Sequence, residues 1–400
     1  MHHDCDVLIV GAGLAGLVAA RDLAERGAKV KLVDAKPAVE RGVRTTGIFV
    51  RRTLEDFELP EDCLGPAVRR VVLHSPGGRR IELESWRDEY RVGRMASLYR
   101  RLLEEGLERG VEWMPGVRYD TSSEVRAGSA VWLERGGRRW RLRTRVLVGA
   151  DGAVSRVARH LGLEENREWL VGVEDVFEGS AFGGPPQLHC YLDPVLAPGY
   201  IGWVADDGEE THVGVAGYAD RFSPRSSLSK MRMKVEKESR LGGLPRVERR
   251  GGRIPVNGIL ERIGCSRGLL IGDAAGAVSP LTAGGLDPCL RLTDLAVQLI
   301  AVHLGGGAAG ALESYSGVAF RRRFRARLML RRLLAAVSRP SVAEAGFLLL
   351  RGPLRGAASR VFFGRGSFPD VDPVVERGSP PPSSLPTDTH IQGQAARGQL

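Results

Sequence analysis

The stretch from Asp6 to Gly16, DVLIVGAGLAG, determines how this chain begins to fold. Its four consecutive apolar residues predict a buried parallel strand. Gly11, Gly13 and Gly16 follow with the spacing G-x-G-x-x-G, and the apolar pattern of residues 14–26 predicts a helix directly after them. The first glycine permits a tight turn, the second lets a pyrophosphate approach the backbone, and the third allows helix and strand to pack closely. The helix N-terminus then offers free N–H groups to the phosphates.

A second predicted strand completes a nucleotide-binding unit. Residues 29–33, KVKLV, are followed by Asp34, about twenty residues beyond the glycine turn. A carboxylate at this place can accept hydrogen bonds from ribose hydroxyls. Because strand, turn, helix and acid occur together, the sequence predicts a dinucleotide site, although this fingerprint does not identify the dinucleotide.

Two later segments repeat the pattern of a short apolar strand that ends near an aspartate. Residues 145–156, RVLVGADGAVSR, contain Asp151, and residues 267–276, RGLLIGDAAG, contain Asp273. An aspartate at the carboxyl end of a strand can bind a sugar-alcohol chain. The small residues after Asp273 leave room for a bulky ring system.

Together, these three segments resemble the flavoprotein oxidoreductases and monooxygenases of the p-hydroxybenzoate hydroxylase fold. Residues 272–282, GDAAGAVSPLT, are most similar to the geranylgeranyl reductase branch, and residues 198–203 with 213–216 resemble its Y-x-W-x-F-P and V-G-x-G stretches. The resemblance covers residues 6–325. It implies an α/β fold, with an FAD-binding Rossmann-like domain of the p-hydroxybenzoate hydroxylase/glutathione reductase type, an inserted β-sheet substrate domain and a C-terminal helical region.

The chain departs from the branch pattern at three places. Residues 44–47 read RTTG where the branch has Cys-Gly-Gly, and residues 283–285 read AGG where it has G-E-G. Residues 204–205 are Val-Ala in place of Phe-Pro. These changes keep the fold and the cofactor but weaken a specific assignment as a prenyl reductase.

The resemblance implies a set of cofactor-binding residues. In it, Asp273 holds the ribityl chain, and the helix that begins near Gly284 and Gly285 directs its positive end toward the flavin pyrimidine. Each of three assignments has an alternative. Asp273 could be an ordinary strand-end cap, Asp151 could have a purely structural role, and Arg44 could be a surface residue. The predicted FAD-binding residues are Gly11, Gly13, Gly16, Asp34, Arg44, Arg94, Asp151, Gly272, Asp273, Gly284 and Gly285.

No catalytic acid or base can be selected from the sequence. This is expected of a flavoenzyme, because the isoalloxazine carries the hydride and the protein mainly shapes a dry pocket. Tyr200, Trp203, Thr45 and Thr46 are the candidates to line that pocket. The alternative for Tyr200 and Trp203 is packing within the core of the sheet.

The bulk properties favour a water-soluble enzyme. The five cysteines are scattered without a C-x-x-C pair, so we expect no disulfide framework and no bound metal. We find no signal peptide and no transmembrane span in the sequence, and we expect a cytoplasmic location. The net charge of +10 comes almost entirely from scattered arginines, which does not favour a nucleic-acid partner.

The composition divides the chain into seven segments. Three of them form the FAD-binding domain, two form the substrate domain, and the last two follow these domains. In chain order they are 1–66 (FAD-binding, first part), 67–87 (β-hairpin of the substrate domain), 88–164 (FAD-binding, second part), 165–250 (substrate sheet), 251–318 (FAD-binding, third part), 319–372 (C-terminal helical region) and 373–400 (disordered tail).

The resemblance implies an FAD-dependent oxidoreductase that saturates a carbon–carbon double bond of a hydrophobic substrate such as a prenyl chain, with NAD(P)H as the electron donor. One alternative is an FAD-dependent monooxygenase that hydroxylates an aromatic or polyketide-like compound. Another is an electron-transfer flavoprotein without its own turnover of a small molecule. The W-x-W-x-I-P stretch of flavin-dependent halogenases is absent.

Residues 320–363 present a further alternative, contact with a membrane. Phe320, Phe324 and Leu328 recur every fourth residue between arginines, as in a basic amphipathic helix at an anionic interface. The competing interpretation, which we favour, is that this face packs against the FAD-binding domain.

Overall fold

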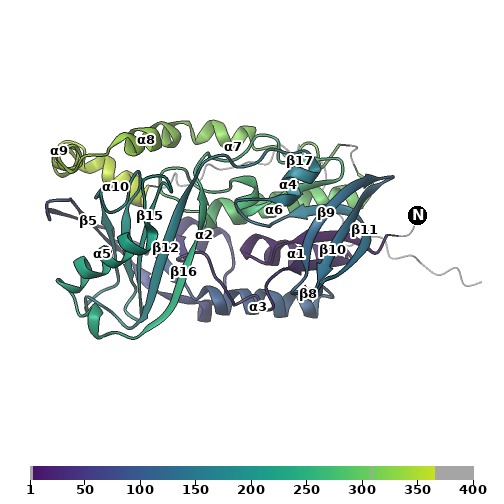
Figure 1. The fold of residues 1–400 in the computed structure, drawn as a ribbon, viewed down its shortest axis with the longest axis horizontal. Coiled ribbons are helices and arrows are strands. Elements are labelled where there is room, and N and C mark those ends of the chain that lie inside the picture. Colours follow the sequence, from purple (N-terminus) through teal and green to yellow (C-terminus); the bar gives the residue numbers. More distant parts are fainter. Residues whose placement is uncertain (1–2, 308–309, 365–400) are drawn as a thin grey trace, which may run out of the picture.

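The computed structural model describes residues 3–307 and 310–364, so the tail expected at 373–400 lies outside the described residues. Two sheets occupy opposite ends of an elongated molecule, and helices lie between them and along its edges (Figure 1). Each of the two sheets is built from segments that lie far apart in the chain, and the division into FAD-binding and substrate segments stays a prediction.

The first sheet has eight strands and is built around β1, the strand predicted from the opening stretch. Its order is β17-β18-β11-β1-β2-β8, with β10 paired to β11 and β9 paired to β10. The strands β18, β11, β1, β2 and β8 run parallel. The bounds are β1 Cys5–Val10, β2 Val30–Asp34, β8 Glu112–Pro115, β9 Arg118–Val125, β10 Gly128–Arg135, β11 Arg138–Gly149, β17 Gly264–Cys265 and β18 Gly268–Leu270.

This strand order gathers distant segments at one edge. β1 ends at the glycine turn, β11 ends at Gly149 before Asp151, and β18 ends at Leu270 before Asp273. Because all three strands are parallel, their carboxyl ends lie side by side, which is where open α/β sheets bind ligands. The sheet therefore brings together the three sequence segments that carry the resemblance.

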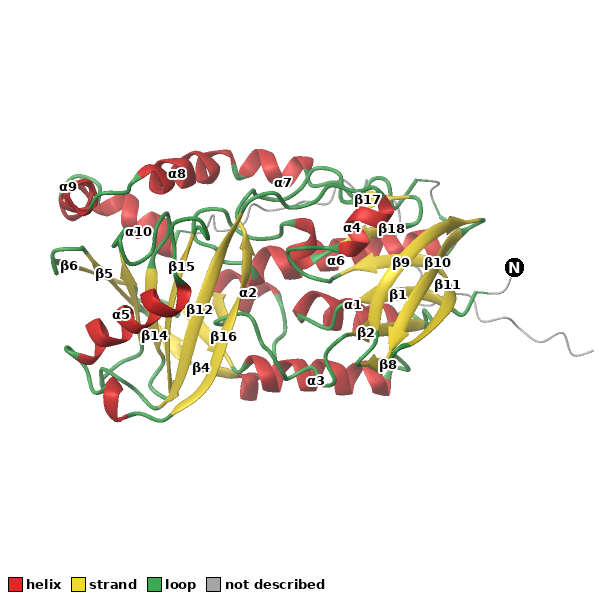
Figure 2. Cartoon of the chain, in the orientation of Figure 1, coloured by secondary structure: helices red, strands yellow, loops and turns green. Residues whose placement is uncertain are grey.

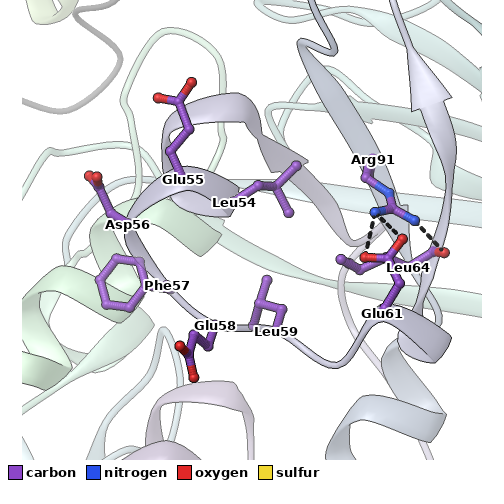
Figure 3. A pocket seen from close by; sticks show the side chains of 9 residues that line it. All are labelled: Leu54, Glu55, Asp56, Phe57, Glu58, Leu59, Glu61, Leu64 and Arg91. Carbon is purple, nitrogen blue, oxygen red and sulfur yellow. Dashed lines mark hydrogen bonds and ion pairs between the residues drawn. The ribbon is translucent and has the colours of Figure 1, made fainter.

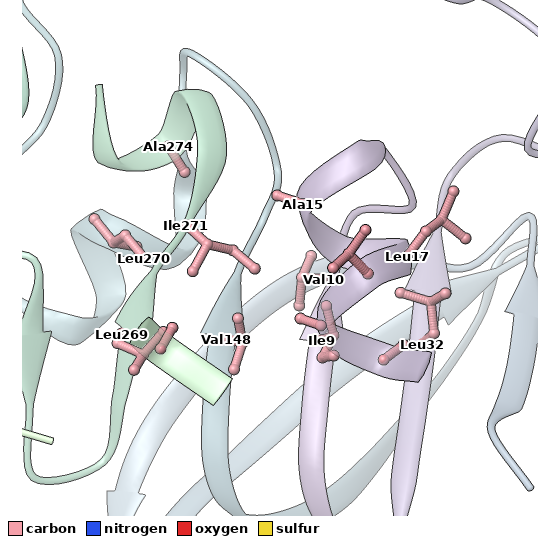
Figure 4. Packing of buried hydrophobic residues seen from close by; sticks show 14 of the residues in the cluster. Ile9, Val10, Ala15, Leu17, Leu32, Val148, Leu269, Leu270, Ile271 and Ala274 are labelled. Atoms are coloured by element: carbon pink, nitrogen blue, oxygen red, sulfur yellow. The ribbon is translucent and has the colours of Figure 1, made fainter. Parts of the chain in front are cut away.

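Helix α1 (Leu14–Glu25) packs between α3 (Met95–Glu108) and α6 (Leu286–Leu304) on this sheet. Aliphatic side chains of β1, α1, β2, β11 and β18 interdigitate in the core beneath the glycine turn (Figure 4). This packing fixes the start of α1 relative to the strand ends.

The second sheet has seven strands, in the order β16-β12-β15-β14-β13-β5-β6. The predicted hairpin supplies β5 and β6, and β5 joins the sheet by pairing in parallel with β13. Helix α5 (Pro224–Glu236) covers part of one face (Figure 2). The bounds are β5 Arg70–His74, β6 Arg80–Glu84, β12 Trp169–Glu178, β13 Gln187–Tyr191, β14 Gly202–Asp206, β15 Glu210–Gly217 and β16 Arg246–Pro255.

A small sheet, which the sequence analysis did not anticipate, has the order β3-β7-β4. The remaining elements before the C-terminal region are short. Their bounds are β3 Ile48–Val50, β4 Leu64–Val68, β7 Tyr90–Gly93, α2 Arg51–Asp56, α4 Arg156–Leu161, and the 3-10 turns η1 Glu61–Cys63, η2 Leu241–Gly243 and η3 Gly272–Ala275.

The C-terminal helices α7 (Val318–Arg323) and α8 (Arg325–Ala336) run along one long edge, from the first sheet toward the second (Figures 1 and 2). Phe320 and Phe324 are buried in the main core, with 2% and 0% of their surfaces exposed. For these two residues the favoured packing interpretation is right, and a membrane-facing role is wrong because the core covers them. Helices α9 (Pro340–Arg351) and α10 (Arg355–Phe363) pack on the second sheet through Phe347 and Ala358.

Candidate functional site

In the turn after β1, the fold requires glycine at two of the three fingerprint positions, whereas the remaining glycine faces open space. Gly11 has φ +109°, and a Cβ there would lie 2.2 Å from the carbonyl oxygen of Ala150. A Cβ on Gly16 would lie 1.9 Å from the carbonyl oxygen of Gly11. In contrast, a Cβ on Gly13 would meet no atom within 4 Å. The open space lies at the start of α1, where the fingerprint places a pyrophosphate.

Asp34 stands directly beside this turn. Its Oδ2 accepts a hydrogen bond from the backbone N–H of Ala12 at 2.7 Å, and its Oδ1 accepts one from the backbone N–H of Lys36 at 2.8 Å. Each carboxylate oxygen has a second lone pair, so the side chain can still accept bonds from ribose hydroxyls. The geometry fits the predicted role of Asp34.

Asp273 lies in η3, between the end of β18 and the start of α6. Burial raises the pKa of Asp273 to about 6, and the nearby charge of Arg44 reduces this effect. Gly285 is the N-cap residue of α6, and a Cβ on it would lie 3.9 Å from Oδ1 of Asp273. The carboxylate therefore lies near the positive end of α6, as binding of a ribityl chain and a flavin ring requires.

Arg44 and Arg94 have different surroundings. The Arg44 side chain passes β16, where a Cβ on Gly252 would lie 3.5 Å from it, and its charge acts on Asp273. Arg94 pairs at 2.7 Å with Asp207, which is buried, and its guanidinium also pairs with Glu209 and Glu210. Arg44 is thus near the predicted flavin site, whereas Arg94 would have to leave three carboxylates to contact a cofactor.

Asp151 organises the start of α4. Its Oδ1 accepts a hydrogen bond from Ser155 at 2.6 Å, and its Oδ2 accepts bonds from the backbone N–H groups of Arg156 and Val157. The guanidinium of Arg156 instead reaches the carbonyl oxygen of Tyr119. These contacts support the structural alternative for Asp151, and its contact with a cofactor stays a prediction.

Two pocket candidates meet at Glu174, a residue that the sequence analysis missed. Glu174 lies on β12 and is 3% exposed. Its Oε2 accepts hydrogen bonds from Thr46 Oγ1 at 2.5 Å and from Trp203 Nε1 at 2.9 Å. The indole ring of Trp203 also lies over Gly214, where a Cβ would come within 2.2 Å of the ring. Glu174 therefore joins the loop after the first βαβ unit to the second sheet.

Charged groups continue from Glu174 across the sheet. His212 of β15 lies between Glu174 and Glu210, and each carboxylate is 3.2 Å from a ring nitrogen. Burial alone would lower the pKa of His212, but the two carboxylates outweigh burial and raise it to about 9. Arg250 lies 3.7 Å from Glu174 and donates a hydrogen bond to the carbonyl oxygen of Thr45. The predicted pocket threonines thus border a buried, charged network.

Tyr200 connects the second sheet to the loop before α6. Its hydroxyl donates a hydrogen bond to the carbonyl oxygen of Thr282 at 2.5 Å. It belongs to an apolar cluster in which side chains of the second sheet meet this loop. We call it the seam cluster; its members are Leu170, Tyr200, Ile201, Trp203, Ala216, Tyr218, Ile254, Val256 and Ala283. Tyr200 and Trp203 are therefore packed among apolar side chains, as in the alternative interpretation. The cluster also includes Ala283, in the loop before α6 that is predicted to lie next to the flavin.

An open pocket lies away from these residues, beside α2 and β4. Arg91 in this pocket pairs with Glu61 and donates a hydrogen bond to the carbonyl oxygen of Leu64 (Figure 3). None of the candidate site residues lines it. Among residues 3–307 and 310–364, no cluster of histidine, cysteine and carboxylate side chains could hold a metal ion.

Comparison with known proteins identifies the family of this chain. Residues 4–332 match the family described as FAD binding domain. The chain is 31% identical over 328 residues to digeranylgeranylglycerophospholipid reductase 1 of Methanopyrus kandleri. The matched region covers 78% of this chain and 84% of that protein. It is 26% identical over 320 residues to the reductase of the same name from Methanococcoides burtonii, covering 75% and 76% of the two chains.

Solved structures share the fold. A geranylgeranyl bacteriochlorophyll reductase-like protein from Thermoplasma acidophilum superposes with a TM-score of 0.76 at 20% identity, covering 87% of this chain and 91% of that one. Aklavinone-11 hydroxylase, in a complex with FAD and aklavinone, superposes with a TM-score of 0.62 at 21% identity, covering 79% and 65%.

The family match over residues 4–332 and the reductase relatives identify an FAD-dependent flavoprotein oxidoreductase. Within that class, the chain belongs to the FAD binding domain family and to its geranylgeranyl-reductase branch, represented by the digeranylgeranylglycerophospholipid reductases. The expected fold class is confirmed, and so is FAD as the cofactor. Among the described residues, we find no helix with the length and apolar character needed to cross a membrane.

Proposed function

We propose that this enzyme reduces carbon–carbon double bonds in the prenyl chains of a hydrophobic substrate. The seam cluster carries the proposal, because it places Tyr200 and Trp203 beside Ala283, in the loop that joins η3 to α6. An apolar chain can lie against such a surface without leaving polar groups unpaired. The names of the relatives, reductases of digeranylgeranyl glycerophospholipids, support a prenyl-chain substrate.

The residues around the cofactor have separable roles in this proposal. Gly13 and the start of α1 hold the pyrophosphate, Asp34 the ribose and Asp273 the ribityl chain. The N-terminus of α6, at Gly284 and Gly285, stabilises negative charge on the ring system. Bound FAD supplies the hydride-transfer chemistry, and we propose NAD(P)H as the donor that reduces it.

An anaerobic reduction experiment tests this function. Purified protein containing FAD is reduced with NADPH, or with dithionite in a parallel sample, and mixed with a geranylgeranyl substrate without oxygen. We expect flavin reoxidation and a product two mass units heavier for each bond reduced. A product that forms only after air is admitted would identify a monooxygenase, and no product under either condition would identify an electron carrier.

We also propose that α8 contacts an anionic membrane, through residues other than those expected from the sequence. Met329, Leu330 and Leu333 have 63%, 42% and 57% of their surfaces exposed. They lie within about one helical turn of each other, and the exposed Arg322 and Arg325 precede them. An exposed apolar face with neighbouring arginines is suited to the interface of a membrane that contains anionic lipids.

Co-sedimentation with phosphatidylglycerol vesicles tests the membrane contact. We expect binding that weakens with salt and is lost in the double variant Met329→Ser, Leu333→Ser. Val247→Ser serves as the matched control, because Val247 is equally exposed but lies on β16. No sedimentation of the wild-type protein at low salt would refute the membrane contact and leave the proposed reduction untouched.

A further inference from the structure

Arg331 of α8 is buried, and among the described residues no acceptor lies in hydrogen-bond geometry to its guanidinium nitrogens. Only 2% of its surface is exposed, and Nε, Nη1 and Nη2 all lack an acceptor. Its charge does act on the nearby Tyr218 hydroxyl, where it opposes the rise in pKa that burial causes. A guanidinium has five N–H donors, and burial of an uncompensated charge is costly. The residue is therefore held in a state that an anionic ligand would stabilise.

Aromatic rings fix the position of this guanidinium. Its central carbon lies 5.6 Å from the ring centre of Tyr200 and 5.1 Å from that of Tyr218. Such contacts offset part of the cost of burial. They do not use the N–H donors that lie in the plane of the guanidinium, which are the donors that a carboxylate or phosphate binds. Both tyrosines belong to the seam cluster, so Arg331 stands at the edge of the proposed substrate surface.

A second arginine, on the same face of α8, contacts the loop before α6. Arg327, one turn before Arg331, donates a hydrogen bond to Oγ of Ser279 at 3.0 Å, and Ser279 Oγ also accepts one from Thr282. Burial lowers the pKa of Arg327, as expected for a cation removed from water. The two arginines thus place positive charge over the loop that leads to Ala283.

We propose that Arg331 binds the phosphate group of the substrate, while the prenyl chain lies along the seam cluster. This assignment rests on the proposed function and specifies its substrate as a phosphate ester. Arginine suits this role because its planar donors can bind two phosphate oxygens at once. A prenyl diphosphate and a prenyl-ether phospholipid present the same phosphate chemistry.

The first test measures anion binding without turnover. Inorganic pyrophosphate is titrated into the FAD-containing protein, and both heat of binding and thermal midpoint are recorded. We expect wild type to bind pyrophosphate and to be stabilised by it, and Arg331→Met to lose both effects. Arg225→Met, at an exposed arginine of α5, is the control and should keep them.

Arg331→Met is chosen because methionine keeps an unbranched apolar stem in place of that of arginine and removes the buried charge of the guanidinium. Such replacements are often neutral or stabilising, so the variant should fold and keep its FAD. Binding of pyrophosphate that is equal in wild type and Arg331→Met, or absent from both, would overturn the proposal. Loss of FAD from Arg331→Met would also overturn it, because the guanidinium would then serve the cofactor.

The second test compares substrates with and without phosphate. For a geranylgeranyl diphosphate and for a digeranylgeranyl phospholipid, we expect Arg331→Met to raise KM about tenfold or more, the range for hydrogen bonds to a charged group. Geranylgeraniol, which lacks phosphate, should show no difference between the two proteins. An effect confined to one phosphate ester would identify the natural ligand, and an equal effect on the alcohol would overturn the proposal. If wild type reduces none of the three, the proposed function fails, and the pyrophosphate titration still decides the role of Arg331.

Discussion

Oε1 of Glu174 lies 3.2 Å from Nδ1 of His212, and both side chains are buried. Burial alone would raise the pKa of Glu174, but the charges of His212 and Arg250 outweigh it and lower that pKa. The pair is therefore charged at neutral pH, within a sheet that also presents Trp203 to the same carboxylate. This arrangement gives the enzyme a measurable dependence of stability on pH.

We predict that the free energy of unfolding falls between pH 6.5 and 8.5. The pKa of His212 rises from 6.5 to about 9 on folding, so its contribution is complete below pH 6.5 and decreases as pH rises toward 9. The loss across this interval is on the order of 2–3 kcal/mol. Urea unfolding at several pH values measures it, and His212→Gln should flatten the slope.

Four other histidines among the described residues do not obscure that interval. Burial lowers the pKa values of His74, His160, His189 and His303, so their contributions to stability change at lower pH. A wild-type slope that persists unchanged in His212→Gln would show that another group is responsible.

We predict that Gly13→Ala weakens FAD binding without destabilising the apoprotein. Gly13 has φ −87°, which alanine adopts easily, and its Cβ would enter open space. Gly16→Ala is the comparison, because its Cβ would lie 1.9 Å from a carbonyl oxygen and should cost about 1–3 kcal/mol of stability. Flavin content after dialysis and thermal unfolding of the apoproteins separate the two effects. Full FAD occupancy in Gly13→Ala would remove this residue from the pyrophosphate site.

We predict that Ala283→Gly stabilises the protein by about 1 kcal/mol. Ala283 has φ +51°, a left-handed conformation that costs a residue with a Cβ about 1–2 kcal/mol. Ala326→Gly, at an exposed position within α8, is the control and should destabilise by about 1 kcal/mol. Chemical denaturation of both variants gives the comparison, and equal losses would show that the loop is not strained at Ala283.

We predict that iodoacetamide does not inactivate the enzyme at pH 7.5. Thr45 and Thr46 stand where the reductase branch has cysteine, and four of the five cysteines are buried. Burial also raises the pKa values of the Cys63 and Cys190 thiols, so little reactive thiolate forms. Peptide mapping should find Cys265 as the main labelled residue, with activity retained. Inactivation that follows labelling of another cysteine, and that substrate prevents, would contradict this prediction.

The sequence could predict those parts of the fold that local patterns encode. The apolar run before Gly11 and the fingerprint after it identify β1 and α1, because strand, turn and helix are contiguous. The hairpin around residues 71–83 could be predicted for the same reason. The small sheet of β3, β7 and β4 could not, since its strands are short and separated by other elements.

The candidate site was harder to predict because its contacts join distant residues. Nothing in the sequence around Glu174 distinguishes it from other acids of β12, yet it binds Thr46 and Trp203 from remote segments. Arg94 illustrates the opposite case, since its position at the start of α3 was clear but its three carboxylate partners were not. The spacing of Phe320 and Phe324 identifies one helix face but cannot say whether core or lipid covers it.

The order of strands in the first sheet has a consequence for synthesis. β1 emerges from the ribosome first, but its neighbour β11 ends at residue 149, and β18 on the far side of β11 ends only at residue 270. Until that point the nascent chain exposes an unpaired edge of apolar strands, which is prone to association with other chains. We therefore expect the dinucleotide site to assemble late and slowly during translation, and the growing chain to depend on chaperones until α6 has covered the sheet.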